Sequence, residues 1–358
     1  MQNKTKREIS CLLALVLALT LVLPAAAANP LQEAADRAAA CVCRLQPAPQ
    51  NGSIGGDWGV LAMARGGYTV PDGYYEHYLT KLEETVRQKQ GVLSTNKYTE
   101  YSRVVLALTA LGKDPTQVAG YDLLAPLASA SGTGRQGVNG SIWALIALDS
   151  GDYVMPKAAT EADQATRHTY VQNILSRQEA SGGWRLGKAP EVDPDLTAMA
   201  LQALAPYRDQ AEVQTAIERG VACLASIQEA QGGFSSWDQA NLESTAQVII
   251  ALCRLGISPE DSRFVKEGKT LLDTLCQSQN LDGSFSHSAD GTGNHQMATE
   301  QALLALTAAL RFRQGKTDLY DMTEKTPVQP GTDRMIQSVT VVTGVPDLLK
   351  QLMSQAKA

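Results

Sequence analysis

A motif that recurs about every 50 residues constrains the fold of this chain more than any other feature. It consists of a glutamine, a glycine four residues later and an aromatic residue six residues later, as in Gln178, Gly182 and Trp184. The glutamine returns as Gln228 and Gln279, so the copies are 50 and 51 residues apart. Each copy follows an amphipathic stretch of helical periodicity and precedes an apolar one. A period of this size, built from two helices, predicts a stacked or closed helical array.

Six amphipathic and six apolar helical stretches alternate along the chain. The amphipathic stretches are 31–46, 74–90, 119–129, 160–178, 209–228 and 259–279, and the apolar ones align at Gly59, Ser102, Ser141, Thr197, Thr245 and Thr299. A helix that is apolar on every side must be surrounded by protein, whereas an amphipathic helix can cover it and face water. We therefore expect an all-α fold, a closed α6/α6 toroid of six inner and six outer helices. An open solenoid is the alternative, but its end hairpins would need capping repeats.

The two ends of the chain differ from the repeats. Residues 1–28 have a basic start, an apolar run from Leu12 to Leu23 and small residues after Pro24, which is the pattern of a signal peptide. The run is short for a bilayer span, and we expect no membrane span once it is removed, although a membrane anchor is the alternative. These features predict a secreted or cell-surface protein. The toroid is expected at 29–320, followed by a linker-like tail at 321–358 with a short terminal helix from Pro346.

The composition narrows the class of partner. The net charge of -6 argues against nucleic acid, whose binding favours a basic face. The histidines and cysteines match no zinc-ligand spacing, so neither a metal nor another cofactor is expected. The sequence does not indicate an oligomeric state.

The repeats resemble those of squalene and oxidosqualene cyclases and of the β subunits of protein prenyltransferases. The cyclase repeat is matched by Ile174, Gln178, Gly182 and Trp184, and phenylalanine replaces tryptophan in the next two copies. The chain looks similar to secreted bacterial proteins with prenyltransferase/squalene-oxidase repeats, and transcobalamin and intrinsic factor carry a related toroid that binds cobalamin. This resemblance implies the fold more than an activity. We expect the glutamine amide to cap backbone groups at a helix end and the ring to pack the corner.

One segment is similar to a catalytic motif. Asp193-Pro194-Asp195-Leu196 resembles the D-x-D-D motif of class II terpene cyclases, in which an acidic aspartate protonates an alkene. The resemblance implies that Asp195 is the proton donor and Asp193 its neighbour, but Leu196 replaces the last aspartate and leaves the carboxylate cluster incomplete. The alternative is that Asp195 compensates a helix N-terminus. The corresponding position of other repeats holds Asp57, Glu100, Asn139 and Glu243, with Met297 in the sixth.

The zinc site of the prenyltransferases is not matched. The resemblance places their Asp-x-Cys ligand pair at Glu243-Ser244-Thr245, and threonine cannot replace the thiolate. The zinc chemistry of the prenyltransferases is therefore not implied for this chain, and whether it is an enzyme stays open.

A ligand site is expected where the N-termini of the inner helices meet, because these helices run in one direction. The candidate ligand-binding residues are Asp57, Trp58, Glu100, Tyr101, Trp184, Phe234, Trp237, Glu243 and Phe285. An apolar cavity with a polar rim is the usual form of a small-molecule site. We expect an apolar or amphiphilic ligand such as an isoprenoid or a corrinoid. The alternatives are a barrel plugged by its own Leu, Ile and Met side chains, a divergent terpene cyclase or prenyltransferase-like enzyme that uses Asp195 with Asp193, and an interaction scaffold.

Overall fold

Two concentric layers of helices make up the fold. The computed structural model describes residues 29–187, 189, 191–236, 239–288 and 295–325. The inner helices are α3 (Asp57–Gly66), α5 (Thr99–Ala110), α7 (Val138–Ser150), α9 (Pro194–Leu204), α11 (Leu242–Leu255) and α13 (His295–Arg313). The outer layer holds α2 (Pro30–Leu45), α4 (Tyr74–Gln88), η1 (Ala125–Ala128) with α6 (Ala130–Gly134), α8 (Arg167–Leu175), α10 (Ala211–Ile227) and α12 (Leu271–Gln277). Short 3-10 turns lie at η2 (Glu161–Asp163), η3 (Ala205–Tyr207) and η4 (Ser262–Phe264).

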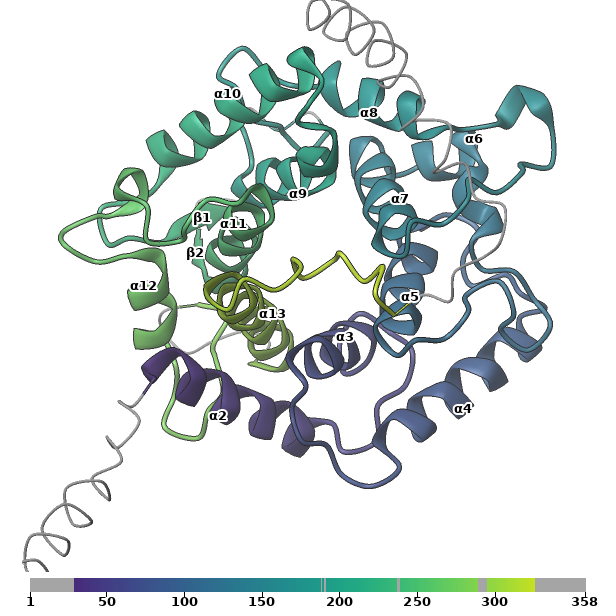
Figure 1. The fold of residues 1–358 in the computed structure, drawn as a ribbon, viewed down its shortest axis with the longest axis horizontal. Helices are drawn as coiled ribbons and strands as arrows, with labels where there is room; N and C mark the ends of the chain where they lie inside the picture. The colour runs from purple at the N-terminus through teal and green to yellow at the C-terminus, as the bar shows by residue number, and fades with distance from the viewer. Residues whose placement is uncertain (1–28, 188, 190, 237–238, 289–294, 326–358) are drawn as a thin grey trace, which may run out of the picture.

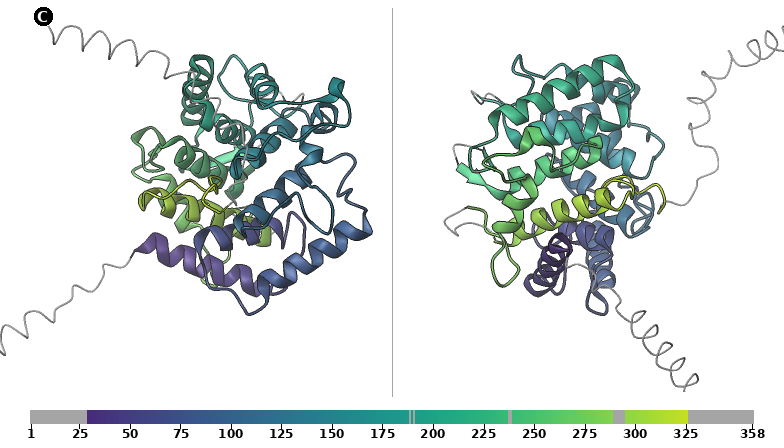
Figure 2. Two further views of the ribbon diagram at one scale, coloured as in Figure 1. Left: turned by 45° about the vertical axis from the view of Figure 1, so that its right-hand side comes forward. Right: turned by 60° about the vertical axis from the view of Figure 1, so that its left-hand side comes forward.

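The inner helices form a closed ring. Each packs on the next in chain order, and α13 returns to pack on α3 (Figure 1). The outer helices cover this ring on its outside (Figure 2). The predicted all-α toroid is thereby confirmed, and the open solenoid is excluded.

Apolar patterning explains which helices lie inside. Every residue of α11 is buried, as a helix surrounded by protein requires. The outer helix α4 instead buries one stripe, Tyr74, Tyr78, Leu82 and Val86, at four-residue spacing. Within the described residues, no helix has both the length and the apolar character needed to cross a membrane.

The repeated glutamines tie the corners of the ring together. Gln178 Nε2 donates to the carbonyl of Gly182 in its own turn, at 2.7 Å, and to that of Ala216 in α10, at 2.8 Å. Gln279 makes the corresponding bonds to its own turn, at 3.2 Å, and to Ala34 of α2, at 2.9 Å. Since α2 is the first outer helix, the last glutamine of the series closes the ring. The prediction that this amide caps a helix end is wrong: it bonds carbonyls of its own turn and of the interior of the next outer helix.

The inner helices begin earlier than the sequence alignment suggests. Helix α9 begins at Pro194, three residues before Thr197. Its N-cap is Asp193, whose Oδ1 accepts from the backbone N–H of Leu196 at 2.8 Å, and proline suits the first helical position. Asn241 caps α11 in the same way. The aligned acidic residues two positions later therefore lie within the first turn and are not the caps.

The chain after α13 closes one end of the barrel. Residues 314–325, yellow in Figure 1, run across the ring from α13 towards α5. Leu319, Tyr320 and Met322 of this segment are buried. The Tyr320 ring packs edge-on against Trp143 of α7, with centroids 6.2 Å apart, and Trp143 contacts Trp58 of α3 at 5.0 Å. We call residues 314–325 the plug segment.

A buried arginine holds the plug segment in place. The Arg65 side chain, in the last turn of α3, is fully buried. Its Nε donates to the carbonyl of Leu319 at 2.9 Å, and its Nη2 donates to those of Asp318 and Asp321 at 2.6 and 2.7 Å. The expected boundary between toroid and tail, at 320/321, falls inside this packed segment. The predicted signal peptide at 1–28 and residues 326–358 of the predicted tail lie outside the described residues.

Candidate functional site

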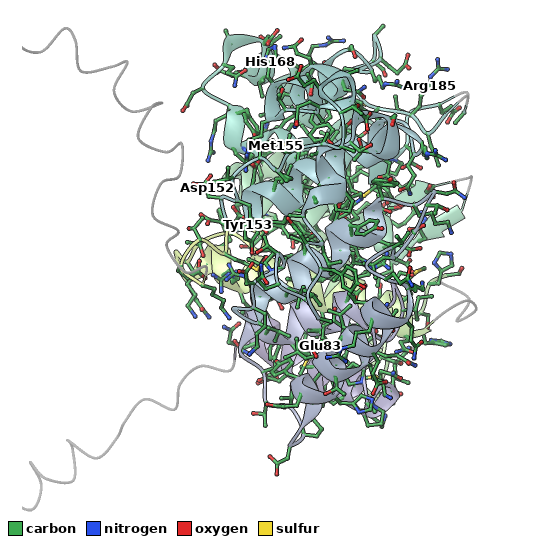
Figure 3. The ribbon with its side chains drawn as sticks, turned by 90° about the vertical axis from the view of Figure 1, so that its right-hand side faces the viewer. Glu83, Asp152, Tyr153, Met155, His168 and Arg185 are labelled. Atoms are coloured by element: carbon green, nitrogen blue, oxygen red, sulfur yellow. The ribbon has the colours of Figure 1, made fainter. Side chains whose placement is uncertain are left out.

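The open end of the barrel holds a cavity of about 560 Å³. It lies at the N-terminal ends of α7, α9, α11 and α13, opposite the plug segment. In the side view of Figure 3, Asp152 and Tyr153 lie towards the plug segment, whereas Arg185, beside the cavity residue Leu186, lies towards the other end. The cavity is lined by Asn139, Leu186, Asp193, Asp195, Leu196, Met199, Ser236, Asn241, Glu243, His287 and Met297.

Asp195 lies in the first turn of α9 with a strongly perturbed acidity. Burial raises the pKa of its carboxyl to about 7. A hydrogen bond with the Ser244 side chain opposes this shift, the charges of Asp193 and Glu243 add to it, and His287 opposes it. Oδ1 of Asp195 is buried and has no hydrogen-bond partner within the described part of the chain. This carboxyl therefore titrates near neutral pH and can hold or release a proton there.

Glu243 and His287 form a pair beside it. Glu243 is in the first turn of α11 and 8% exposed, and its Oε2 lies 2.9 Å from Nδ1 of His287. Its other oxygen, Oε1, is buried without a partner among the residues that the structure describes. Asn139 Oδ1, in the first turn of α7, is in the same state. A buried hydrogen-bond acceptor without a partner destabilises the folded state by roughly 1–3 kcal/mol. Three such acceptors, on Asn139, Asp195 and Glu243, line this one cavity, which favours a ligand that would pair with them.

A short hairpin completes the wall. Strands β1 (Phe234–Ser236) and β2 (Gln239–Asn241) pair antiparallel just before α11. Ser236 donates from its Oγ to Oδ2 of Asp193 at 2.6 Å, so the N-cap of α9 is bonded to the hairpin of the next repeat. Sequence reasoning missed Ser236, Met199 and the hairpin itself. Two three-residue strands carry no periodic signal by which they could have been found.

Asp57 and Trp58 do not line the cavity. Asp57 is fully buried, where its Oδ2 accepts from Arg103 Nε at 2.7 Å and its Oδ1 accepts from the Tyr78 hydroxyl at 2.7 Å. Burial raises the pKa of Asp57, and these bonds oppose the rise. Trp58 contacts Trp143 inside the ring. Both residues therefore have structural partners.

The other predicted residues divide between corner packing and the cavity. Glu100 and Tyr101 lie in the first turn of α5, where Tyr101 is 3% exposed and packs against Tyr98. Three rings, those of Trp184, Phe234 and Phe285, are fully buried at the corners between layers. The Trp184 indole donates to the carbonyl of Ile174 at 2.8 Å, as a packed corner requires. Trp237 lies outside the described residues. Among the described residues, Glu243 is the one predicted ligand-binding residue that lines the cavity. The predicted catalytic residues Asp193 and Asp195 line it as well.

A second hollow of about 590 Å³ lies near the plugged end. Its charged groups are largely paired with one another. Arg167 Nε lies 2.7 Å from Asp149 Oδ1, and Arg254 bonds Asp318 and covers the Tyr320 ring. Within the described ranges, no group of three His, Cys, Asp or Glu residues is arranged to hold a metal ion. The mouth cavity is therefore the better candidate site.

Sequence comparison identifies the family. The family model of the prenyltransferase alpha-alpha toroid domain matches residues 128–324, which are 197 of the 358 residues. The chain belongs to this family. No curated protein matches the chain significantly.

Solved structures of low sequence identity share the fold. A variant of the type II terpene cyclase MstE from Scytonema, in complex with the product merosterolic acid A, is 15% identical with a TM-score of 0.52, and the match covers 79% of this chain and 98% of that chain. The unsaturated glucuronyl hydrolase from Bacillus sp. GL1 is 14% identical with a TM-score of 0.53, covering 81% and 98%. The toroid is thus shared with terpene cyclases and with glycosidases, and at this identity the likeness shows the fold alone.

Proposed function

We propose that this protein binds a small amphiphilic molecule in the mouth cavity. The observation that carries the proposal is the composition of the lining. Apolar side chains of Leu196, Met199 and Met297 lie beside the carboxyls of Asp195 and Glu243, each of which has one buried oxygen without a hydrogen-bond partner among the described residues. An apolar pocket with a few convergent polar groups and a perturbed pKa is the usual form of a binding site. We also propose that the protein acts outside the cytoplasm, on the strength of the signal-peptide pattern at 1–28.

The size of the cavity favours the smaller of the two expected ligand classes. A volume of about 560 Å³ is within the range of pockets for drug-sized molecules. A hollow of about 870 Å³ shares Leu186, Asp193 and Ser236 with this cavity. The smaller space, the one that Asp195 and Glu243 line, suits a single isoprenoid chain better than a corrinoid macrocycle. The cyclase MstE, which shares the toroid, has been solved in complex with geranylgeranyl dihydroxybenzoate as its substrate. This likeness of fold supports a ligand with an apolar body.

A fluorescence titration with the neutral apolar dye Nile red tests the proposal. We expect saturable binding at one site, and we expect Met199→Trp to abolish it, because the larger side chain fills the cavity. Met155→Trp is the matched control, since Met155 is also partly buried but lies outside the cavity. Equal dye binding by the two variants would place the site elsewhere and contradict the proposal.

A second candidate function is acid catalysis by Asp195. The raised pKa of about 7 favours it, because a general acid works best when its pKa is near the operating pH. Incubation with geranylgeranyl dihydroxybenzoate, followed by chromatography with mass detection, would reveal a cyclised product as a species of unchanged mass and changed retention. We expect Asp195→Asn to remove that product. A product that persists in this variant would remove Asp195 from the catalytic role.

A further inference from the structure

We propose that the ligand of the mouth cavity carries a cationic amine head, which donates hydrogen bonds to Asn139, Asp195 and Glu243. The inference rests on the proposed function and specifies the chemistry of its ligand. The expected ligand is apolar or amphiphilic, and the inference identifies its polar head group as an amine.

The first argument is the state of three oxygen atoms. Asn139 Oδ1, Asp195 Oδ1 and Glu243 Oε1 are buried and lack a hydrogen-bond partner within the described residues. All three residues line the cavity, from the first turns of the consecutive inner helices α7, α9 and α11. Glu243 is 8% exposed, so water reaches it little. The amide oxygen of Asn139 and the ionised carboxylates of Asp195 and Glu243 are acceptors, so a ligand that satisfies them brings donors.

The second argument is the sign of the charge. Asp193, Asp195 and Glu243 line the cavity, and His287 is the one basic side chain among the described lining residues. A phosphate or diphosphate head would face these carboxyls, and the lining residues that the structure describes include no lysine or arginine to bind it. The helix N-termini add partial positive charge, about half a unit each, but Asp193 already caps α9 and Asp195 lies in its first turn. An anionic head is therefore disfavoured.

The third argument separates an amine from a neutral diol. An alkylammonium group presents three N–H donors from one atom and accepts no hydrogen bond, which matches a set of acceptors. A diol brings two donors together with further lone pairs that would need donors from the wall. Beyond the polar group the lining is Leu186, Leu196, Met199 and Met297, which suits an aliphatic body. The probe that represents this chemistry is a simple long-chain amine.

Calorimetric titration of the full mature chain with decylamine, 1,2-decanediol and decyl phosphate, each below its micellar concentration, tests the inference. We expect decylamine to bind at least tenfold more tightly than the diol, and decyl phosphate more weakly than either. Glu243→Gln should weaken decylamine at least tenfold and the diol less than threefold, because it removes a charge and leaves the shape. Glu218→Gln, an exposed change on α10, is the control and should alter neither.

The outcomes separate this inference from the proposed function. If the diol or the phosphate binds as tightly as the amine, the cationic head is wrong and small-molecule binding stands. If none of the three probes binds, the proposed function fails as well. Asp195→Asn is a second variant in case Glu243→Gln unfolds through loss of its contact with His287, and it should weaken decylamine selectively in the same way.

Discussion

Buried carboxyls at the N-termini of the inner helices have two different environments. Asp57 is bonded on both oxygens by Arg103 and Tyr78, so its burial is compensated. Glu300 of α13 is 1% exposed, and its Oε1 accepts from the backbone N–H of Gly55 at 2.9 Å. Its Oε2 has no partner in the part of the chain that the structure describes. Burial, with a smaller contribution from the charge of Asp57, raises the pKa of Glu300 to about 8.

The pKa of Glu300 predicts how stability depends on pH. The folded pKa of about 8 is above the ordinary value of 4.5, so the folded state binds the proton more tightly. The contribution of the protonated Glu300 to the free energy of unfolding is fully present below about pH 4.5 and is lost as pH rises towards 8. Glu300→Gln keeps the shape without the ionisation. We expect the variant to be more stable than the natural protein at pH 8, by on the order of 3 kcal/mol, and similar to it at pH 4.5.

Urea unfolding at several pH values measures this difference. Glu218→Gln, on the exposed face of α10, should leave the pH dependence unchanged. If the stability of Glu300→Gln falls with rising pH as steeply as that of the natural chain, ionisation of Glu300 does not destabilise the folded state, and the prediction is wrong.

The site residues show what sequence can and cannot indicate at this scale. Asn139, Asp195 and Glu243 occupy one aligned position of three repeats, so the alignment indicated that they lie at the same end of the barrel. It did not indicate that Asp57, at the same position of another repeat, is bonded to Arg103 and Tyr78 outside the cavity. The corner rings were expected at the mouth because they precede the inner helices in sequence. They turn instead into the space between the two layers, a direction that depends on tertiary packing. His287, in the long connection between α12 and α13, contacts Glu243 through tertiary packing and could not be assigned by spacing.

At the scale of the element, the repeated turn requires glycine for two reasons. Gly283 has a φ of +86°, which side chains rarely tolerate, and a Cβ there would lie 2.5 Å from the carbonyl oxygen of Arg37 in α2. Gly182 repeats this relation with Arg219 of α10. The outer helix of the following repeat therefore packs directly on the turn. The sequence motif indicated this turn correctly because each part of it, amide, glycine and ring, has a local role.

We expect Gly283→Ala to destabilise the protein by about 2–3 kcal/mol, since it strains the backbone and forces α2 away from the corner that closes the ring. Gly134→Ala is the control, because a Cβ at Gly134 meets nothing within 4 Å. Its effect should stay within about 0.5 kcal/mol. Thermal unfolding compares the two, and equal melting temperatures would contradict the close approach of α2 to this turn.

At the scale of the whole molecule, the toroid has two unlike ends. One is closed by the plug segment, whose Tyr320 ring packs on Trp143, and the other holds the cavity. The closed ring itself could be predicted, because alternating apolar and amphipathic helices allow few other arrangements. The plug segment could not, because its residues follow no repeat and are positioned by buried side chains of distant helices, Arg65 of α3 and Arg254 of α11.

Replacing this arginine tests the plug segment. Arg65→Met keeps the length and apolar stem of the side chain but leaves the carbonyls of Leu319 and Asp321 unpaired. We expect a loss of about 3 kcal/mol in unfolding free energy, measured by urea denaturation. Arg263→Met, which removes an exposed arginine that bonds the neighbouring Asp261, should cost less than about 1 kcal/mol. Equal costs would mean that the plug segment contributes little to the fold.

A crystal structure of the protein grown with decylamine tests the central claim most directly, because it locates the ligand and its head group together. We predict the amine nitrogen within hydrogen-bond distance of Asp195 and Glu243, and the alkyl chain against Met199 and Met297. Decylamine bound at the plugged end, or bound in the cavity with its nitrogen turned away from both carboxyls, would contradict the account.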